Sequence, residues 1–432
     1  MSDLTTAWAY NTDAYKNLKA QIETDPDFVV SLELSLEVAG LRARTELKPE
    51  LYLALDNVFG GDGQGWPTTS EAYLAYIAKY LVLIPNEQND PGLPNAWKNN
   101  GQQNGYNQKV YDLLCQFYLL VDQPLYGNGG TLQDYTNGEF VFADWLRTFA
   151  TDWGIFLDHP LSLTPTTKAS FFADSMYNMD WYKDNAGSWT TFNEFFYRQF
   201  NHADERGQSP LRPIAEPRSN NAIVSSADCT YIMKYPIYEE GRVLGLNGKP
   251  TSVTLKNTHE VFTIAELLQD EELAEHFKGG TFVHYFLSPF DYHRFHSPIS
   301  GRVKECRHVQ GNVYLDVDLG KGEFHAPDSA VGGYEFNQSR GVFVVDSEGP
   351  EGLVASVPIG MAQVSGVDMR DLTGKYVAKG DEFGKFKFGG SDTILLFQRN
   401  PDLYLFEKDP SHVPIHFQYG QVAAYWNVNE QR

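Results

Sequence analysis

The spacing of apolar residues along the chain predicts helices first and strands later. In residues 142–153, and again in 110–121, apolar residues recur every three or four positions, which is the period of an amphipathic helix. Gly154 follows the first of these stretches and predicts its end. The stretch 189–200 predicts one more amphipathic helix. The first part of the chain is therefore expected to be helical, with its aromatic stripes forming a core.

From about residue 221 the pattern changes to that of strands. Short apolar or alternating runs separated by glycines appear at 312–319, 341–348, 352–360 and 393–398. A connector punctuated by prolines, 201–220, precedes them. The chain is therefore predicted to be an α+β protein. A helical N-terminal domain, 1–200, is followed by a mostly β domain, 201–432, whose sheets form a compact sandwich or barrel.

The charge balance narrows the classes of partner. The 432 residues include 34 Lys and Arg against 56 Asp and Glu, which gives a net charge of −22. Nucleic acid and anionic membranes both need basic surfaces, so neither is expected as a partner. The apolar runs are too short for an integral membrane segment, and no signal peptide pattern opens the chain. Three cysteines without CxxC spacing fit reduced thiols, and the expected location is cytoplasmic.

The densest group of chemically active side chains lies in "HYFLSPFDYHRFHSPISG", residues 284–301. His293 and His296 stand three positions apart within it. Such a pair is typical of a general acid and base, of two metal ligands, or of ordinary polar residues at a strand end. The usual companions of zinc, a nearby pair of cysteines or an HExxH sequence, are absent, so no metal ligand is predicted.

A second candidate is the glycine pair in "KFKFGGSDTILLFQ", residues 385–398. Gly389 and Gly390 precede Ser391 between two stretches of predicted strand. A glycine pair indicates a bulge, a turn, or a backbone that must bend into a reactive shape. Asp228, in "SSADCTY", is by itself a turn residue. Together these residues include the types that a nucleophile, its base and an orienting acid require.

The order of these motifs resembles the phosphatidylserine decarboxylase family. The resemblance covers about 190–400 and is carried by "TFNEFFYRQF", "SSADC", "YFLSPFDYHRFHSPISG", "VPIGMAQVSG" and "VAKGDEFGKFKFGGSD". The long helical region, with "DWGIFLDHP", resembles the soluble branch of that family, which includes the fungal L-tryptophan decarboxylase of psilocybin biosynthesis. Asp392 departs from the pattern, because the lipid enzymes typically carry Thr after the serine.

The resemblance implies a pyruvoyl enzyme made by self-cleavage. The scissile bond would join Gly390 to Ser391, with Gly389 in support, and would divide the chain into a β chain, 1–390, and an α chain, 391–432. Ser391 would be the nucleophile and would become the pyruvoyl cofactor. These assignments follow the family's motifs and not the spacing of the residues.

The resemblance also implies roles for the remaining site residues. His296 matches the base for self-cleavage, Asp228 the acid that orients His296, and His293 the residue for decarboxylation. The expected activity is that of a carboxy-lyase, which removes the α-carboxylate of a soluble L-amino acid, aromatic and tryptophan-like, through a Schiff base and releases CO2 and an amine.

Two alternatives remain. One is decarboxylation of phosphatidylserine to phosphatidylethanolamine, and the other is an inactive family member or a metal-binding scaffold. The family's typical assembly, a homodimer, is implied in the same way.

Overall fold

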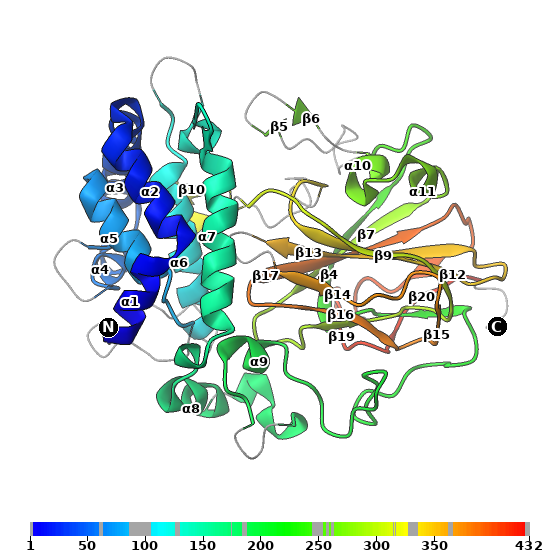
Figure 1. The fold of residues 1–432 in the computed structure, drawn as a ribbon. Coiled ribbons are helices and arrows are strands. Elements are labelled where there is room, and N and C mark those ends of the chain that lie inside the picture. Colours follow the sequence, from blue (N-terminus) through cyan, green and yellow to red (C-terminus); the bar gives the residue numbers. More distant parts are fainter. Residues whose placement is uncertain are drawn as a thin grey trace.

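The computed structural model is drawn in Figure 1. It describes residues 3–59, 64–85, 105–125, 130–173, 175–183, 188–243, 254–255, 259–260, 263–313, 315, 317–326, 336–361 and 366–427. Helices gather in the N-terminal part and strands in the C-terminal part, which confirms the predicted α+β class (Figure 1). The division at residue 200 stays a prediction.

The helical part is built from nine α-helices in the described residues. They are α1 (Asp3–Asn11), α2 (Asp13–Thr24), α3 (Pro26–Glu46), α4 (Pro49–Asp56), α5 (Ser70–Tyr80), α6 (Gly105–Val121), α7 (Phe142–Leu157), α8 (Pro165–Ala173) and α9 (Phe192–Phe196). Local chemistry sets their ends. At α3, for example, Asp25 accepts hydrogen bonds from the first free N–H groups, and Pro26 fits the first turn.

Two helix boundaries differ from the prediction. Helix α7 runs three residues beyond Gly154, because Phe156 and Leu157 continue its buried face. Burial of two large side chains outweighs the roughly 1 kcal/mol that glycine costs within a helix. In 189–200 only α9 forms, since the chain leaves the helix at Tyr197. The helix predicted over 110–121 is confirmed by α6.

One antiparallel sheet of eight strands dominates the C-terminal part. Its order is β15 (Tyr376–Val377), β9 (Gly301–Val309), β12 (Arg340–Asp346), β13 (Leu353–Met361), β17 (Gly390–Phe397), β7 (Thr281–Leu287), β4 (Cys229–Pro236) and β19 (His416–Phe417). The strands predicted at 341–348, 352–360 and 393–398 are confirmed by β12, β13 and β17. Over 312–319 the described residues enter a strand only at Asp318.

Smaller elements complete the fold. Two sheets of three strands are β14 (Val367–Met369), β16 (Glu382–Phe386), β8 (Arg294–His296), and β18 (Tyr404–Leu405), β20 (Val422–Tyr425), β3 (Ala222–Val224). Three hairpins are β1 (Thr136–Asn137) with β2 (Phe140–Val141), β5 (Thr254–Leu255) with β6 (His259–Glu260), and β10 (Asp318–Gly320) with β11 (Glu323–His325). Two short helices are α10 (Ile264–Leu268) and α11 (Glu271–Glu275).

The large sheet is covered on both faces. On one face the sheet of β14, β16 and β8 packs against it, with the rings of Phe343 and Phe383 stacked 3.9 Å apart. On the other face α10 and α11 contribute Ile264, Leu268 and Ala274 to a second core. None of the sheets in the described part of the chain closes into a barrel. The structure is therefore an open sandwich, within the range that the sequence predicted.

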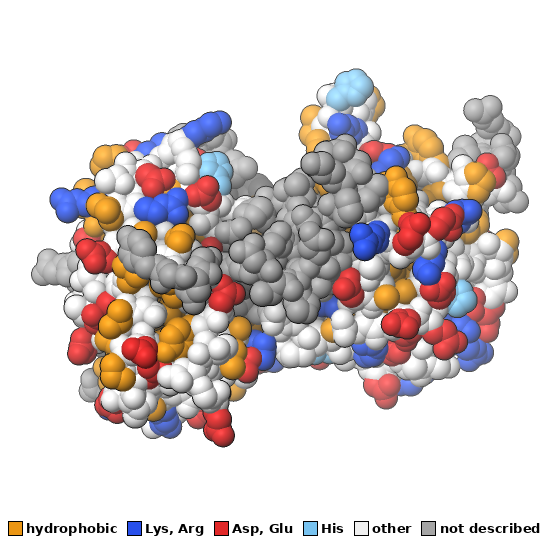
Figure 2. Space-filling view, turned by 90° about the horizontal axis from the view of Figure 1, so that it is seen from above, with side chains coloured by type: hydrophobic (Ala, Val, Ile, Leu, Met, Phe, Trp, Pro, Cys, Tyr) orange, Lys and Arg blue, Asp and Glu red, His pale blue; other side chains and the backbone are white. Residues whose placement is uncertain are grey.

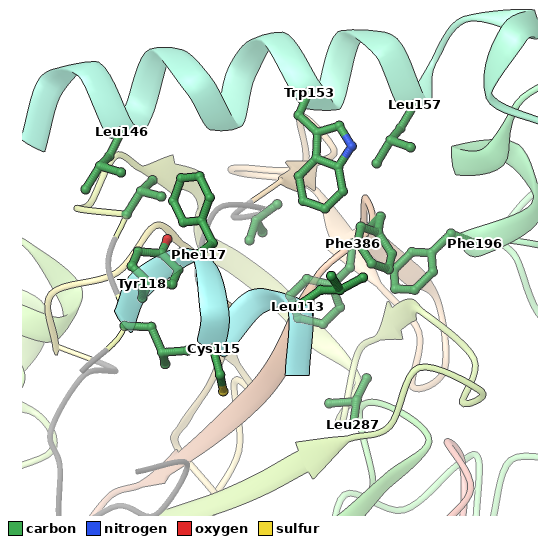
Figure 3. Packing of buried hydrophobic residues seen from close by; sticks show 14 of the residues in the cluster. Leu113, Cys115, Phe117, Tyr118, Leu146, Trp153, Leu157, Phe196, Leu287 and Phe386 are labelled. Atoms are coloured by element: carbon green, nitrogen blue, oxygen red, sulfur yellow. The ribbon is translucent and has the colours of Figure 1, made fainter. Parts of the chain in front are cut away.

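The helical and β parts share one hydrophobic core. Trp153 and Leu157 of α7 point toward Phe196 and Phe386, while Leu287 lies beneath them (Figure 3). Burying a side chain of this size stabilises the fold by roughly 2 kcal/mol. Helix α7 thus stands directly against the strands that carry the candidate site. Among the described helices, none is both long and apolar enough to cross a bilayer.

Candidate active site

Ser391 lies near the start of an inner strand of the large sheet. It is the second residue of β17 and pairs with Gly360 of β13 on one side and Leu287 of β7 on the other. Its side chain is 1% exposed, and its Oγ has no hydrogen-bond partner among the described residues. A buried hydroxyl without a partner loses the hydrogen bonds that water would give it, so its burial costs free energy. Buried polar groups that stay unpaired in a native structure often have a catalytic role.

His296, at the end of β8, is held on both ring nitrogens. Nδ1 lies 2.8 Å from the carbonyl oxygen of Gly380, and Nε2 lies 3.2 Å from the hydroxyl of Tyr292. A carbonyl can only accept, so Nδ1 carries the proton and Nε2 accepts from Tyr292. The ring of Tyr419 stacks on the imidazole at 3.8 Å. Burial lowers the pKa of His296 to about 4, so its side chain is a neutral base.

The carbonyl that fixes His296 belongs to a tight turn. Gly380 has φ +86°, and a Cβ there would lie 2.5 Å from the Ile214 side chain. Glycine therefore suits the position on both counts. The neighbouring Lys379 is buried, and its ammonium donates to backbone carbonyls of the connector, including that of Glu216 at 2.9 Å. Burial lowers the pKa of Lys379 to about 8.

Asp228 makes no hydrogen bond to the ring of His296, whose nitrogens are bonded to Gly380 and Tyr292. Its carboxylate accepts from Arg212 Nη2 at 3.0 Å and from the backbone N–H of Tyr419 at 2.8 Å. The backbone N–H of His296 donates to the carbonyl of Ser226, two residues before Asp228. Asp228 therefore reaches the imidazole through Tyr419, whose backbone it binds and whose ring lies on His296.

His293 has very different surroundings. It is fully buried, and neither ring nitrogen has a hydrogen-bond partner among the described residues. Its ring stacks on Phe196 at 3.8 Å and meets the edge of Phe386 at 6.5 Å. Burial, and secondly the charge of Arg198, lower its pKa well below the ordinary value. Arg198 also donates to the carbonyls of Phe290 and Asp291, which fixes the turn that leads to His293.

His293 and His296 have no set of companion metal ligands in the part of the chain that the structure describes. Within the described ranges, no group of three or more His, Cys, Asp or Glu side chains could hold a metal ion. His296 already uses one nitrogen on a carbonyl. The three cysteines, Cys115, Cys229 and Cys306, are buried and form no disulfide.

Asp392, which departs from the family pattern, has a partner. Its Oδ2 lies 3.1 Å from Nε2 of His284 on β7, and both side chains are fully buried. Because side chains alternate along a strand, Asp392 faces the opposite side of the sheet from Ser391. The carboxylate therefore does not lie on the side where the hydroxyl of Ser391 points.

A cleft of about 430 Å³ lies between α7 and the sheets. Its lining includes Arg147 and Thr151 from α7 together with His308, Ser339 and Lys387 from the β part. Phe388, three residues before Ser391, also lines it. Ser391, His293, His296 and Asp228 are not among its lining residues. Three residues span at most about 11 Å, so part of the cleft wall lies within that distance of Ser391. A cleft of this size suits a small molecule.

Sequence reasoning missed the residues that hold the histidines. Tyr292 lies next to His293 in the quoted motif, and its hydroxyl would have been a reasonable partner for a nearby base. Arg198 lies in "TFNEFFYRQF", where a lone arginine among aromatic residues is the available signal. Arg212 opens the short motif "RPI", 212–214, which stands between "TFNEFFYRQF" and "SSADC" in the family's order and was the available signal. Tyr419 is far from the motifs, and no local pattern indicates it.

A comparison with protein families finds a match for the β part of the chain and for α9. The family model for phosphatidylserine decarboxylase matches residues 192–422, which is more than half of the chain. Helix α7 lies outside the matched range.

Three similar proteins come from a yeast, a bacterium and a plant. Phosphatidylserine decarboxylase proenzyme 3 of Schizosaccharomyces pombe is 31% identical over 266 residues, which cover 61% of this chain and 24% of that protein. The proenzyme of Fusobacterium nucleatum is 30% identical over 256 residues, covering 59% of this chain and 75% of that protein. Phosphatidylserine decarboxylase proenzyme 2 of Oryza sativa subsp. japonica is 29% identical over 257 residues, covering 60% of this chain and 37% of that protein. The match thus spans less than two thirds of the yeast and rice proteins.

Proposed function

Because the chain belongs to the phosphatidylserine decarboxylase family, a family of pyruvoyl-dependent carboxy-lyases, we propose that it cleaves itself between Gly390 and Ser391 and then decarboxylates an amino-acid group. The observation that carries the proposal is the Ser391 hydroxyl, which is buried without a partner beside the glycine carbonyl. His293 and His296, which belong to the motifs that carry the resemblance, are also buried, and burial lowers their pKa values so that both side chains are neutral.

The surroundings of Ser391 fit a pyruvoyl group at that position. The orphaned hydroxyl needs no hydrogen bond to be broken before it reacts. The strand that follows it pairs with β13 and β7 as far as Phe397, so a new chain end at residue 391 would stay in place. A pyruvoyl group supplies a carbonyl that combines with the substrate amine and takes up the electron pair left when CO2 departs.

The proposed self-cleavage uses only groups of this chain and one water. The Oγ of Ser391 bonds to the carbonyl carbon of Gly390, and the Gly390 C–N bond breaks, which gives an ester and a free amine. Loss of the Cα proton of residue 391 then breaks the C–O bond and releases the carboxylate of Gly390. The remaining enamine becomes an imine, and water replaces its nitrogen, which leaves as ammonia.

His296 is proposed as the base that takes the Ser391 proton. Its Nε2 holds the lone pair, and its low pKa keeps it neutral at physiological pH. The Tyr292 hydroxyl bonds that lone pair, so it must turn away before the imidazole takes the proton. Asp228 is proposed to orient His296 by fixing Tyr419, while Arg212 balances the charge of the carboxylate.

His293 is proposed to handle the proton in decarboxylation. Its two unpartnered nitrogens leave it able to bond a bound molecule, and Phe196 and Phe386 exclude water from one side. A dry site favours the loss of a carboxylate as neutral CO2, because the charged ground state loses its hydration there.

The names of the relatives favour phosphatidylserine as the substrate, with phosphatidylethanolamine as the product. A soluble, aromatic L-amino acid remains the second candidate, because a cleft of about 430 Å³ with a wall from α7 suits a small molecule. On the face seen in Figure 2, Lys and Arg side chains are interspersed with Asp and Glu over the β part. Such mixing attracts an anionic membrane less than a basic patch would.

The mature enzyme is proposed to consist of a β chain, 1–390, and an α chain, 391–432, and to act in the cytoplasm as a homodimer. Intact-protein mass spectrometry of the purified wild type tests the cleavage. Two chains are expected, and the smaller should be lighter by one ammonia than the same chain beginning with serine. A single chain of 48.8 kDa that persists on incubation would contradict the proposal.

A second measurement separates the two substrates. The cleaved protein is given either phosphatidylserine vesicles or free tryptophan, tyrosine or phenylalanine, and released CO2 is measured. CO2 from the vesicles alone assigns the lipid. CO2 from a free amino acid alone assigns the soluble substrate.

A further inference from the structure

The segment just before the candidate scissile bond is held by side chains of two helix ends. The amide Oδ1 of Asn193, in α9, accepts from the backbone N–H of Phe388 at 3.0 Å. Its Nδ2 donates to Oδ1 of Asp158 at 2.9 Å, and Lys387 Nζ donates to the other oxygen of Asp158 at 2.7 Å. We call Asp158 and Asn193 the clamp, since together they bind two consecutive residues of this segment.

Both members of the clamp have fixed positions. Asp158 is the C-cap residue that directly follows α7. Asn193 is fully buried in the first turn of α9, where Thr191 and Glu194 form a capping box. The backbone N–H of Phe192 is also bonded, to Ser162 Oγ at 2.9 Å. Short, well-capped helix ends make a firm base for the two side chains.

The ring of Phe388 is enclosed by the same helices. It meets Trp153 of α7 edge to face at 5.6 Å, and Phe192 and Phe196 of α9 at 5.1 Å and 5.2 Å. Phe196 also carries the stacked ring of His293. The position of residue 388 is therefore fixed by its backbone, its side chain and its neighbour, Lys387.

We infer that the clamp positions residues 387–390 for self-cleavage and afterwards holds them as part of the cleft wall. The inference rests on the proposed function. Attack by Ser391 Oγ requires the carbonyl of Gly390 to be presented to it, yet two glycines leave that stretch of backbone little stiffness of its own. The strand pairs fix the chain from Gly390 onward, and the clamp fixes it at Phe388, so that only Gly389 lies between the two supports.

The cleft explains why the clamp would matter after cleavage too. Asp158, Asn193, Lys387 and Phe388 all line it. Once the bond is cut, residues 387–390 end in a free carboxylate, and the clamp together with the ring contacts of Phe388 would keep this tail against α7. Loss of the clamp should therefore raise KM as well as slow maturation.

An exchange of the two clamp side chains tests the inference. Asn193→Asp removes the donor to Asp158 and sets two carboxylates against each other, so cleavage should slow roughly a hundredfold, as for a reacting group displaced by about 1 Å. In the double variant Asn193→Asp with Asp158→Asn, the new amide can donate to the new carboxylate and accept from Lys387, so the rate should return to within a few fold of wild type. The rate is followed as the appearance of two chains on gels after synthesis in a cell-free system.

A milder variant protects the test against misfolding. Lys387 is 38% exposed, and Lys387→Met removes only its bond to Asp158, so the fold should persist and cleavage should slow several fold. The matched control is Lys304→Met, which breaks a pair with Asp346 of similar exposure, 47% and 27%, on the strand pair β9–β12. This control should cleave at the wild-type rate.

The outcomes are distinguishable. Wild-type cleavage by Lys387→Met and Asn193→Asp would overturn the clamp and leave the proposed function standing. A double variant no faster than Asn193→Asp, with both melting as the wild type does, would also overturn it. A wild-type protein that stays in one chain would overturn the proposed function and the clamp together.

Discussion

His293 and His296 belong to one short stretch of chain, yet the protein treats them in opposite ways. His296 has both nitrogens bonded and lies against Tyr419. His293 has neither nitrogen bonded within the described part of the chain and lies between Phe196 and Phe386. A base that acts within the chain gains from a fixed tautomer, whereas a group that meets a substrate must keep its nitrogens available. The difference is what the proposal requires, in which His296 serves self-cleavage and His293 serves decarboxylation.

Removal of the nucleophile should give the largest effect, because both histidines would then lose their reactions. Ser391→Ala is expected to leave one intact chain without decarboxylase activity, as seen by gel and CO2 release. Ser411→Ala, in an exposed turn, is the control and should cleave normally. Decarboxylation by Ser391→Ala would show that a different group carries the chemistry.

Replacement of His296 should block maturation. His296→Gln is expected to slow cleavage by roughly 10² to 10⁴-fold, the range for loss of a general base. The readout is the half-time for conversion into two chains. Cleavage at the wild-type rate would mean that another residue takes the Ser391 proton and that the bonded histidine is structural.

Replacement of His293 should separate the two reactions. His293→Gln is expected to cleave at close to the wild-type rate, because His293 contacts neither Ser391 nor His296 by hydrogen bond. The cleaved variant should release CO2 roughly 10²-fold more slowly or worse. Full decarboxylase activity after cleavage would contradict the proposed role of His293. Failure to cleave would show that His293, like His296, is needed for self-cleavage.

Acid should destabilise the fold through protonation of His296. Burial lowers the pKa of His296 to about 4, whereas an exposed histidine titrates near 6.5. The unfolded chain therefore binds a proton at a pH where the folded chain does not, so the stability contribution is complete above about pH 6.5 and is lost as the pH falls toward 4. The loss is on the order of 3 kcal/mol. Thermal melts of wild type and His296→Gln at pH 7 and 5 should show a smaller drop for the variant.

Removal of the Tyr292 hydroxyl should change the rate of self-cleavage least. Tyr292→Phe leaves His296 bonded to Gly380 and stacked on Tyr419, and it frees the lone pair on Nε2. Cleavage is expected at the wild-type rate or a few fold faster, with the half-time measured across pH 5 to 8. A loss of more than tenfold would show that Tyr292 passes the proton on to His296.

The sequence was sufficient where the information is local. Apolar spacing located α6, α7 and the central strands, and the order of motifs brought Ser391, His293, His296 and Asp228 to attention. It was insufficient where partners are distant in the chain. Tyr419 stacks on His296 from near the C-terminal end, and no periodicity encodes that contact. Gly154 was misread as an end because burial of later residues outweighed its local preference.

The strand order of the C-terminal segment has a consequence for the cut protein. Residues 391–432 contribute all but the first residue of β17 to the centre of the large sheet, β19 to its edge, and β18 and β20 to a separate sheet. A cut before residue 391 would leave two polypeptides interwoven through two sheets, with no way to part except by unfolding. Folding of the uncut chain is a first-order event, but recovery after denaturation of the cut protein would require two molecules to meet. The uncut chain would thus fold at a rate independent of its concentration, whereas the yield of refolded cut protein would fall as the protein is diluted.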